Sequence, residues 1–150
     1  MNRSRLVQLI RDPKLFLQKL SKVPSNLPIW SRIAQLKFLK RIGKRYVLIP
    51  MKGHKLWIDL QDATLGYYFF LFREYEPYET SLLEHAIKPG MTIVDIGANI
   101  GYYTVKFARR TSSEGSVYAF EPDANNMFLL KKNLTLNHLD NVICEQVAVM

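Results

Sequence analysis

The sequence predicts an α/β protein with a Rossmann-like, doubly wound sheet. The first observation is that apolar strand patterns alternate with amphipathic helix patterns from residue 91 to residue 149. The second is a glycine-containing turn, Asp95 to Gly101, directly after the first of these strands. The third is an acidic residue, Glu121, at the end of the next strand. Strand, helix, strand, helix, strand is one half of such a fold, so the sheet is expected to be incomplete.

The segment from residue 77 to residue 149 carries these strand and helix patterns in turn. Its strand segments are near-continuous apolar runs, as expected when helices cover both faces of a parallel sheet. Pro77 suits the first turn of a helix, and Asp123 suits an N-cap. Strands are therefore predicted at residues 91–95, 116–120 and 142–149, and helices at residues 77–87, 102–110 and 123–137.

The preceding residues predict further helices and a short hairpin. Apolar positions recur at helical spacing from Ile29 to Ile42 with basic residues between them, which predicts an amphipathic helix whose apolar stripe packs on the protein. The aromatic run at residues 67–72 is expected in the core, with a base-stacking platform as the alternative. A helix is also predicted at residues 4–22, a helix-breaking segment at residues 24–28, and two strands at residues 46–50 and 55–60.

The composition is that of a soluble globular protein. The chain has 150 residues, of which 48% are hydrophobic and 23% are charged, enough for one domain of ordinary size. Its single cysteine, Cys144, excludes an internal disulfide and is expected to be a buried, unreactive thiol in a reducing compartment. Charged residues interrupt residues 6–20, which argues against a signal peptide or a transmembrane helix there. The predicted location is cytoplasmic.

The positive charge is concentrated in the N-terminal third of the chain. Residues 1–55 contain 14 Lys and Arg against one acidic residue, whereas residues 56–150 contain 7 against 12, which together give the net charge of +8. We therefore predict a basic helical N-terminal extension at residues 1–55 and half of the doubly wound domain at residues 56–150. The basic residues are interpreted as a solvated face. The alternatives are binding of nucleic acid and peripheral contact with a membrane through residues 1–45.

The turn after the first strand has the residues that a ligand-binding loop needs. Gly97 allows the chain to turn sharply off the strand, and Gly101 allows the following helix to pack close to the sheet. Asn99 tolerates left-handed backbone geometry. The three residues are expected to bring the backbone close to a ligand outside the carboxyl ends of the strands.

The residues around this turn indicate a nucleoside ligand. Glu121 lies 20 residues after Gly101, where a carboxylate can accept hydrogen bonds from both hydroxyls of a ribose and would repel a 2′-phosphate. The Gly-x-Asn-x-Gly spacing differs from the Gly-x-Gly-x-x-Gly of dinucleotide sites. Asp95 would sit poorly beside a pyrophosphate, but well beside the sulfonium and amino groups of S-adenosylmethionine. Electrostatics therefore favours S-adenosylmethionine over NAD.

The two motifs, Val94 to Thr104 and Val117 to Pro122, resemble those of the FkbM family of class I methyltransferases. The resemblance covers about residues 56–150 and implies a class I methyltransferase fold with S-adenosylmethionine as the methyl donor. It implies O-methylation of a sugar or secondary-metabolite hydroxyl. It also places Glu121 at the ribose and Pro122 beside the adenine. The cofactor-binding residues that it implies are Asp95, Gly97, Ala98, Asn99, Gly101, Tyr102, Glu121 and Pro122.

The sequence assigns no general base, no metal ligand and no oligomeric state. The expected partner is a small-molecule or glycan hydroxyl acceptor, and nucleic acid is not expected. Two alternatives stay open: a nucleic-acid methyltransferase or RNA-binding module that uses the basic arm, and a non-catalytic nucleoside- or NAD-binding domain. Because a complete methyltransferase sheet has more strands, the chain is expected to be a fragment or part of a split enzyme, inactive alone.

Overall fold

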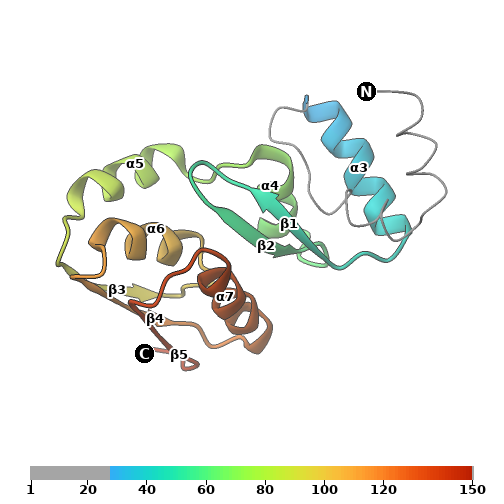
Figure 1. Ribbon diagram of the computed structural model, residues 1–150. Helices are drawn as coiled ribbons and strands as arrows, with labels where there is room; N and C mark the ends of the chain where they lie inside the picture. The colour runs from blue at the N-terminus through green and yellow to red at the C-terminus, as the bar shows by residue number, and fades with distance from the viewer. Residues whose placement is uncertain (1–27, 150) are drawn as a thin grey trace.

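The computed structural model describes residues 28–149, which form a hairpin, a three-stranded sheet and the helices around them (Figure 1). The helix predicted at residues 4–22 and most of the breaker at residues 24–28 lie outside the described part of the chain. Within residues 28–149, no helix is long and apolar enough to cross a membrane. In chain order the elements are α3 (Ile29–Arg41), β1 (Tyr46–Pro50), β2 (Lys55–Asp59), α4 (Leu65–Phe72), α5 (Pro77–Ala86), β3 (Thr92–Ile96), α6 (Tyr102–Thr111), β4 (Ser116–Phe120), α7 (Ala124–Leu136) and β5 (Val142–Glu145).

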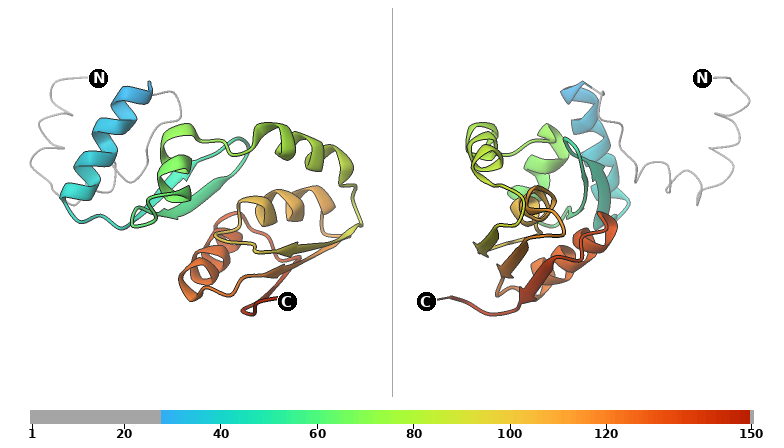
Figure 2. Two further views of the ribbon diagram at one scale, coloured as in Figure 1. Left: turned by 180° about the vertical axis from the view of Figure 1, so that it is seen from behind. Right: turned by 60° about the vertical axis from the view of Figure 1, so that its left-hand side comes forward.

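The larger sheet is parallel, in the order β3-β4-β5. Helices α6 and α7 cover one of its faces (Figures 1 and 2). On the opposite face, the alternate side chains Val94, Ile96 and Ile143 are exposed. Each strand is connected to the next through a helix, as the predicted α/β fold requires. The predicted fold class is therefore confirmed, but the expectation that helices cover both faces of the sheet was wrong for the described residues.

Strand β5 is shorter than the sequence predicts. It ends at Glu145, which pairs with Phe120, the last residue of β4. The prediction of a strand to residue 149 was wrong because the ladder ends where the Glu121 amide donates to the Glu145 carbonyl at 3.2 Å, and the next residue, Pro122, has no amide to donate. Cys144, expected to be buried, is half-buried, and burial raises the pKa of its thiol.

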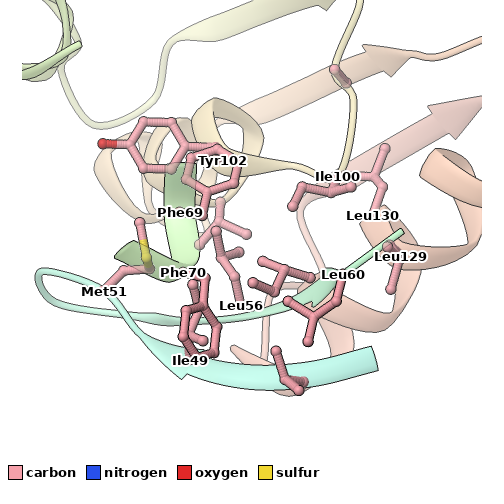
Figure 3. Close-up of a cluster of buried hydrophobic side chains, with 14 of the residues drawn as sticks. Ile49, Met51, Leu56, Leu60, Phe69, Phe70, Ile100, Tyr102, Leu129 and Leu130 are labelled. Atoms are coloured by element: carbon pink, nitrogen blue, oxygen red, sulfur yellow. The ribbon is translucent and has the colours of Figure 1, made fainter. Parts of the chain in front are cut away.

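The two short strands form the predicted antiparallel hairpin, in the register Tyr46↔Asp59 to Pro50↔Lys55. The alternation of its apolar residues gives it one buried face, which packs against α4, the loop before α6, and α7 (Figure 3). The domain boundary predicted between residues 55 and 56 falls at the start of β2, and it remains a prediction. The fully buried residues of the hairpin are Val47, Ile49, Leu56 and Ile58.

Two asparagines on α7 join the hairpin to the larger sheet's helices. Asn133, which is fully buried, accepts a hydrogen bond from the Trp57 amide at 2.6 Å and donates to the Trp57 carbonyl at 3.1 Å. One turn later, Asn137 makes the same pair of bonds with Lys55. The Asn133 amide also donates to the Ile100 carbonyl at 2.8 Å, which fixes the loop before α6. These side-chain amides satisfy backbone groups on the free edge of β2, as a neighbouring strand would.

Helices α3 and α4 differ from the expectation. The predicted apolar stripe of α3 is buried only at Leu36 and Leu39, whereas Trp30 is 71% exposed. The aromatic run forms helix α4, for which no helix was predicted, and buries Phe69 and Phe70 in the core. The eight residues of α4 include no charged or strongly polar side chain, so the sequence shows no helical periodicity there. The helix is therefore determined by its packing on the rest of the protein.

Candidate functional site

A cavity of about 340 Å³ lies at the carboxyl end of β3, where α/β sheets bind ligands. Its volume is in the usual range for small-molecule sites. The loop between β3 and α6 forms one wall, and α4 with the segment before α5 forms the other. The lining residues are Leu65, Phe69, Tyr75, Glu76, Asp95, Ile96, Gly97, Ala98, Asn99, Ile100, Tyr102 and Tyr103.

The backbone amides of the loop at residues 97–101 are all engaged within the protein. The amides of Gly97 and Ala98 donate to the Phe120 carbonyl at 2.9 and 3.0 Å. The Asn99 amide donates to the Glu121 carboxylate at 2.8 Å. The Ile100 amide donates to the Asn99 side chain, and the Gly101 amide to the Ala98 carbonyl. The loop therefore offers no free amide to a pyrophosphate, which is the group that dinucleotide-binding loops hold with their amides.

Asp95 brings a carboxylate to the cavity from the end of β3. Its Oδ2 accepts a hydrogen bond from the Thr104 hydroxyl at 2.6 Å. Burial raises the pKa of Asp95, and the nearby Glu121 carboxylate adds to this rise, while the Thr104 hydrogen bond opposes it. A raised pKa means that the ionised carboxylate lacks a compensating cation in the protein.

Glu76 brings a second carboxylate from the opposite wall. It precedes α5 with a left-handed backbone, φ 43°, which is uncommon for a residue with a side chain. Its Oε2 accepts a hydrogen bond from the Tyr103 hydroxyl at 2.7 Å. The pKa of Tyr103 is raised, first by burial and then by this bond. Strained residues of this kind concentrate at functional sites.

The two loop glycines have different roles. A Cβ at Gly97, φ +78°, would meet no atom within 4 Å, so the space beside the backbone is open toward the cavity. A Cβ at Gly101, φ +90°, would lie 2.6 Å from Leu130 Cδ1 on α7. Gly97 therefore permits close approach of a ligand, and Gly101 permits close packing of the loop on α7. Asn99 adopts the expected left-handed conformation, φ 49°.

Glu121 and Pro122 do not line the cavity. Glu121 is 5% exposed, and its carboxylate accepts the amides of Asn99 at 2.8 Å and Asp123 at 2.9 Å. It thus holds the loop against the end of β4. A ribose hydroxyl would have to use the remaining lone pairs of this carboxylate. Pro122 is exposed beside it. Of the predicted site residues, Asp95, Gly97, Ala98, Asn99 and Tyr102 meet at one cavity, and Gly101, Glu121 and Pro122 lie outside it.

Of the aromatic residues that line the cavity, the sequence predicted only Tyr102 as a site residue. Tyr102 stacks on Phe69 (Figure 3), with 5.2 Å between ring centroids. The Tyr102 hydroxyl donates to the Tyr75 carbonyl at 3.0 Å. Tyr103 packs edge-on against Tyr102 at 5.1 Å. The available signal was Tyr75-Glu76-Pro77, in which a proline-started helix directly follows a polar aromatic and a carboxylate.

The cavity is electronegative. Two carboxylates, Asp95 and Glu76, are among the residues that line it, together with aromatic rings, and no Lys, Arg or His is. Acidic groups and aromatic faces attract a cation, and both disfavour a phosphate. A parallel sheet with such a cavity at the end of its first strand is the arrangement of class I methyltransferases, whose donor is the cationic S-adenosylmethionine.

Comparison with known proteins gives the family. The model of the TRM5/TYW2 methyltransferase domain matches residues 50–148, and the chain belongs to this family. The predictions of a methyltransferase domain and of S-adenosylmethionine as its cofactor are confirmed. No curated protein matches the sequence.

Several solved structures share the fold at low sequence identity. Methanocaldococcus jannaschii TYW2 in complex with AdoMet superposes with a TM-score of 0.54 and 22% identity over 67% of this chain and 42% of that one. The M. jannaschii tRNA m1G37 methyltransferase gives 0.52 and 18%, over 70% and 30%. The complex of aTrm5 with tRNALeu gives 0.54 and 19%, over 69% and 28%. The chain thus spans well under half the length of these proteins.

Two expectations from the sequence are corrected by these comparisons. The resemblance to the FkbM family is not supported, and the TRM5/TYW2 family fits instead. The expectation of a glycan or small-molecule acceptor, with nucleic acid set aside, is contradicted by the similar structures, which include a complex with tRNALeu and a tRNA m1G37 methyltransferase. The resemblance rested on the loop after β3 and on Glu121, which the sequence assigned to the donor alone, so these motifs carry no information on the acceptor.

Proposed function

We propose that this chain binds S-adenosylmethionine and forms the donor-binding part of a tRNA methyltransferase. The observation that carries the proposal is the electronegative cavity at the end of β3, with Asp95 and Glu76 on opposite walls and no basic residue in the lining. The donor has a sulfonium and an ammonium group, and both are attracted by carboxylates. When bound, S-adenosylmethionine supplies a methyl group that is already activated for transfer.

The cavity residues have complementary roles in this proposal. Asp95 and Glu76 attract the cationic groups of the donor. The rings of Tyr102 and Tyr103 form part of the cavity wall, and they are held in place by stacking on Phe69 and Phe107. The N-terminus of α6 has no side-chain cap, so its first amides are suited to the donor's carboxylate. Ala98 and Asn99 shape the wall beside these groups.

Three further residues support the cavity from outside. Glu121 holds the loop through the Asn99 amide and is proposed to accept a ribose hydroxyl with its free lone pairs. Pro122 is proposed to border the adenine. Gly101 lets α7 approach the loop, because Leu130 occupies the position of its missing Cβ. The assignment of these residues to the donor is part of the proposal.

Transfer RNA is the proposed acceptor because of the fold relatives and the charge distribution. Trm5 with tRNALeu and the tRNA m1G37 methyltransferase are both structurally similar to this chain. The basic residues are concentrated in residues 1–55, where they outnumber acidic residues 14 to 1. Cationic segments bind the phosphates of RNA with little dependence on sequence. The basic extension at residues 1–55 is therefore proposed to contact the RNA.

Calorimetric titration of S-adenosylhomocysteine and of NAD into the chain tests the donor site. We expect saturable binding of the first and none of the second. Asp95→Asn removes the charge but keeps the shape, and should weaken binding by about 10- to 100-fold, as for the loss of a charge-assisted hydrogen bond. Glu114→Gln, an exposed carboxylate between α6 and β4, is the matched control and should change nothing. Equal affinity for NAD would contradict the proposal.

Transfer of a tritiated methyl group tests the acceptor. The chain is incubated with labelled S-adenosylmethionine and unmethylated tRNA, and the precipitated label is counted before and after ribonuclease treatment. Because the chain is proposed as the donor-binding part only, we expect it to bind tRNA, which filter binding detects. Any label that it transfers should be released by ribonuclease and reduced by Asp95→Asn. A chain that binds S-adenosylhomocysteine but neither binds nor labels tRNA would contradict the RNA acceptor and leave the donor site standing.

A further inference from the structure

A second cavity, of about 170 Å³, lies on the other side of Tyr102. It is enclosed by the turn of the β1–β2 hairpin, the end of α4, and helices α5 and α6. Tyr102 belongs to the lining of both cavities. The second cavity differs from the first in its chemistry, because its lining includes His54, Arg73 and Lys106.

Arg73 is a buried cation without a hydrogen-bond partner in the cavity wall. The residue is 7% exposed, and its Nε, Nη1 and Nη2 are shielded from solvent with no acceptor within reach. It ends α4 with a left-handed backbone, φ 63°, and its guanidinium lies over the Phe70 ring at 4.9 Å. Burial lowers the pKa of Arg73 to about 10, and the positive charge of Arg32 contributes. A guanidinium in this state lacks the anion that would compensate its burial.

His54 adds an unused hydrogen-bond acceptor to the same cavity. Its Nδ1 lies 3.1 Å from the Lys52 carbonyl, which can only accept, so Nδ1 carries the proton. Its Nε2 then has a lone pair, is shielded from solvent, and has no partner. Burial lowers the pKa of His54 to about 4, and Lys106 and Arg109 lower it further, so the ring is neutral at neutral pH.

The other charges around the cavity leave Arg73 uncompensated. Lys106, 7% exposed, is neutralised by its salt bridge with Glu84 at 2.8 Å. Glu74 and Lys52 are both exposed at the rim, with opposite charges. The complementary ligand therefore carries an anionic group for the guanidinium of Arg73 and a hydroxyl donor for Nε2 of His54.

A ribose-phosphate unit has both groups. Guanidinium groups bind phosphate oxygens through two parallel hydrogen bonds. The ribose 2′-hydroxyl is a hydrogen-bond donor that RNA has and DNA lacks. We propose that the cavity beside Tyr102 binds the backbone of the RNA acceptor, with a phosphodiester on Arg73 and the adjacent 2′-hydroxyl on His54. This site rests on the proposed function in its choice of RNA, and it extends that function by placing the RNA backbone one side chain away from the donor cavity.

Fluorescence anisotropy with a labelled RNA and the DNA of the same sequence tests the site on the full chain. Arg73→Met removes the cation and keeps a side chain of similar length, so the fold is not expected to suffer. We expect it to weaken RNA binding by about tenfold or more and to reduce the slope of log K against log salt by about 0.7. His54→Phe keeps the ring and should lower the preference for RNA over DNA by about fivefold. Lys88→Met, an exposed cation after α5, is the control.

Two further measurements distinguish a site for free phosphate from a site for the phosphate of RNA, and this inference from the proposed donor function. Unfolding temperature is measured in phosphate and in chloride at equal ionic strength. If phosphate stabilises the chain through Arg73 while Arg73→Met leaves RNA affinity unchanged, the cavity is a free-phosphate site and the RNA assignment is overturned. If Arg73→Met matches Lys88→Met in every measurement, the site itself is overturned. RNA affinity that depends on Arg73 in a chain without S-adenosylhomocysteine binding would refute the proposed function and support this inference.

Discussion

The two cavities on either side of Tyr102 are opposite in charge and in hydrogen bonding. The cavity at the end of β3, which we propose as the site of the methyl donor and call the donor cavity, has carboxylates whose oxygens already accept bonds from Thr104 and Tyr103. The second cavity has a guanidinium and an imidazole nitrogen without partners. A polar site whose groups hold one another is organised before its ligand arrives, whereas a buried group without a partner destabilises the protein until a ligand satisfies it.

A single short segment produces this contrast. Arg73 and Glu76 both have left-handed backbones, with φ of 63° and 43°, and are separated by only two residues. Arg73 lines the second cavity, and Glu76 lines the donor cavity. The hydroxyl of Tyr102 holds this segment through both the amide and the carbonyl of Tyr75. The strained backbone therefore places the cation of Arg73 in one cavity and the carboxylate of Glu76 in the other, with Tyr102 between them.

The largest expected effect is on stability, and it comes from the hydrogen bonds that join α7 to the β1–β2 hairpin. Asn133→Leu removes three hydrogen bonds and leaves the Trp57 and Ile100 backbone groups unpaired, so the free energy of unfolding should fall by about 3–5 kcal/mol. Asn137→Leu, which removes the equivalent pair at the more exposed Lys55, should lower it by about 1 kcal/mol. Urea denaturation measures both. Equal losses would show that α7 does not hold the hairpin in this way.

The loop glycines separate stability from donor binding. Gly101→Ala should lower the free energy of unfolding by about 2–3 kcal/mol, because its Cβ would collide with Leu130 at a positive φ. The Cβ of Gly97→Ala would meet no neighbour, so the free energy of unfolding should fall by only about 1 kcal/mol, from backbone strain. Relative to this loss of stability, the loss of donor affinity should be larger for Gly97→Ala than for Gly101→Ala. Calorimetry and denaturation together check the contrast. A greater stability loss for Gly97→Ala would refute it.

The free energy of unfolding should depend on pH through His54, which lines the second cavity. Its pKa in the folded chain is about 4, against 6.5 when unperturbed, so the unfolded chain binds more protons between these values. The stabilising contribution is fully present above pH 6.5 and is lost as the pH falls toward 4, by about 2–3 kcal/mol. His54→Phe should flatten this part of the profile. Parallel profiles for the two proteins would contradict a buried neutral imidazole.

The smallest expected effect is a gain of stability at Arg73. Arg73→Met removes a buried cation that has no hydrogen-bond partner and keeps the contact with Phe70, so the free energy of unfolding should rise by about 1–2 kcal/mol. Thermal unfolding in chloride, without phosphate, measures it. A loss of stability would mean that the guanidinium is already compensated within the protein.

The parallel sheet and the loop after β3 could be predicted from the sequence because each depends on residues that are close together in the chain. The strand β3, the turn at Gly97, the left-handed Asn99 and the Asp123 cap follow from the conformational preferences of single residues or from apolar runs. Asp123 accepts the amides of Asn125 and Asn126, as a cap should. The end of β5 was not predictable in this way, since it depends on where β4 stops.

The parts that the sequence left undecided or did not predict depend on contacts between distant segments. Glu76 and Tyr75 reach the cavity because Tyr102, 27 residues later, binds the Tyr75 backbone. Arg73 and His54 are separated in sequence and meet only through the packing of the hairpin on α4 and α6. The acceptor class could not be predicted from the motifs either, because the sequence assigned the loop and Glu121 to the donor alone.

The central claim is that the donor cavity selects a cation through its carboxylates. The most direct test compares the dissociation constants of S-adenosylmethionine, which has a sulfonium, and S-adenosylhomocysteine, which has a neutral thioether, in the wild-type chain and in Asp95→Asn. We predict that the substitution weakens binding of the sulfonium ligand by an additional factor of about five, corresponding to about 1 kcal/mol. Unchanged affinities, or a greater loss for the thioether, would contradict the account.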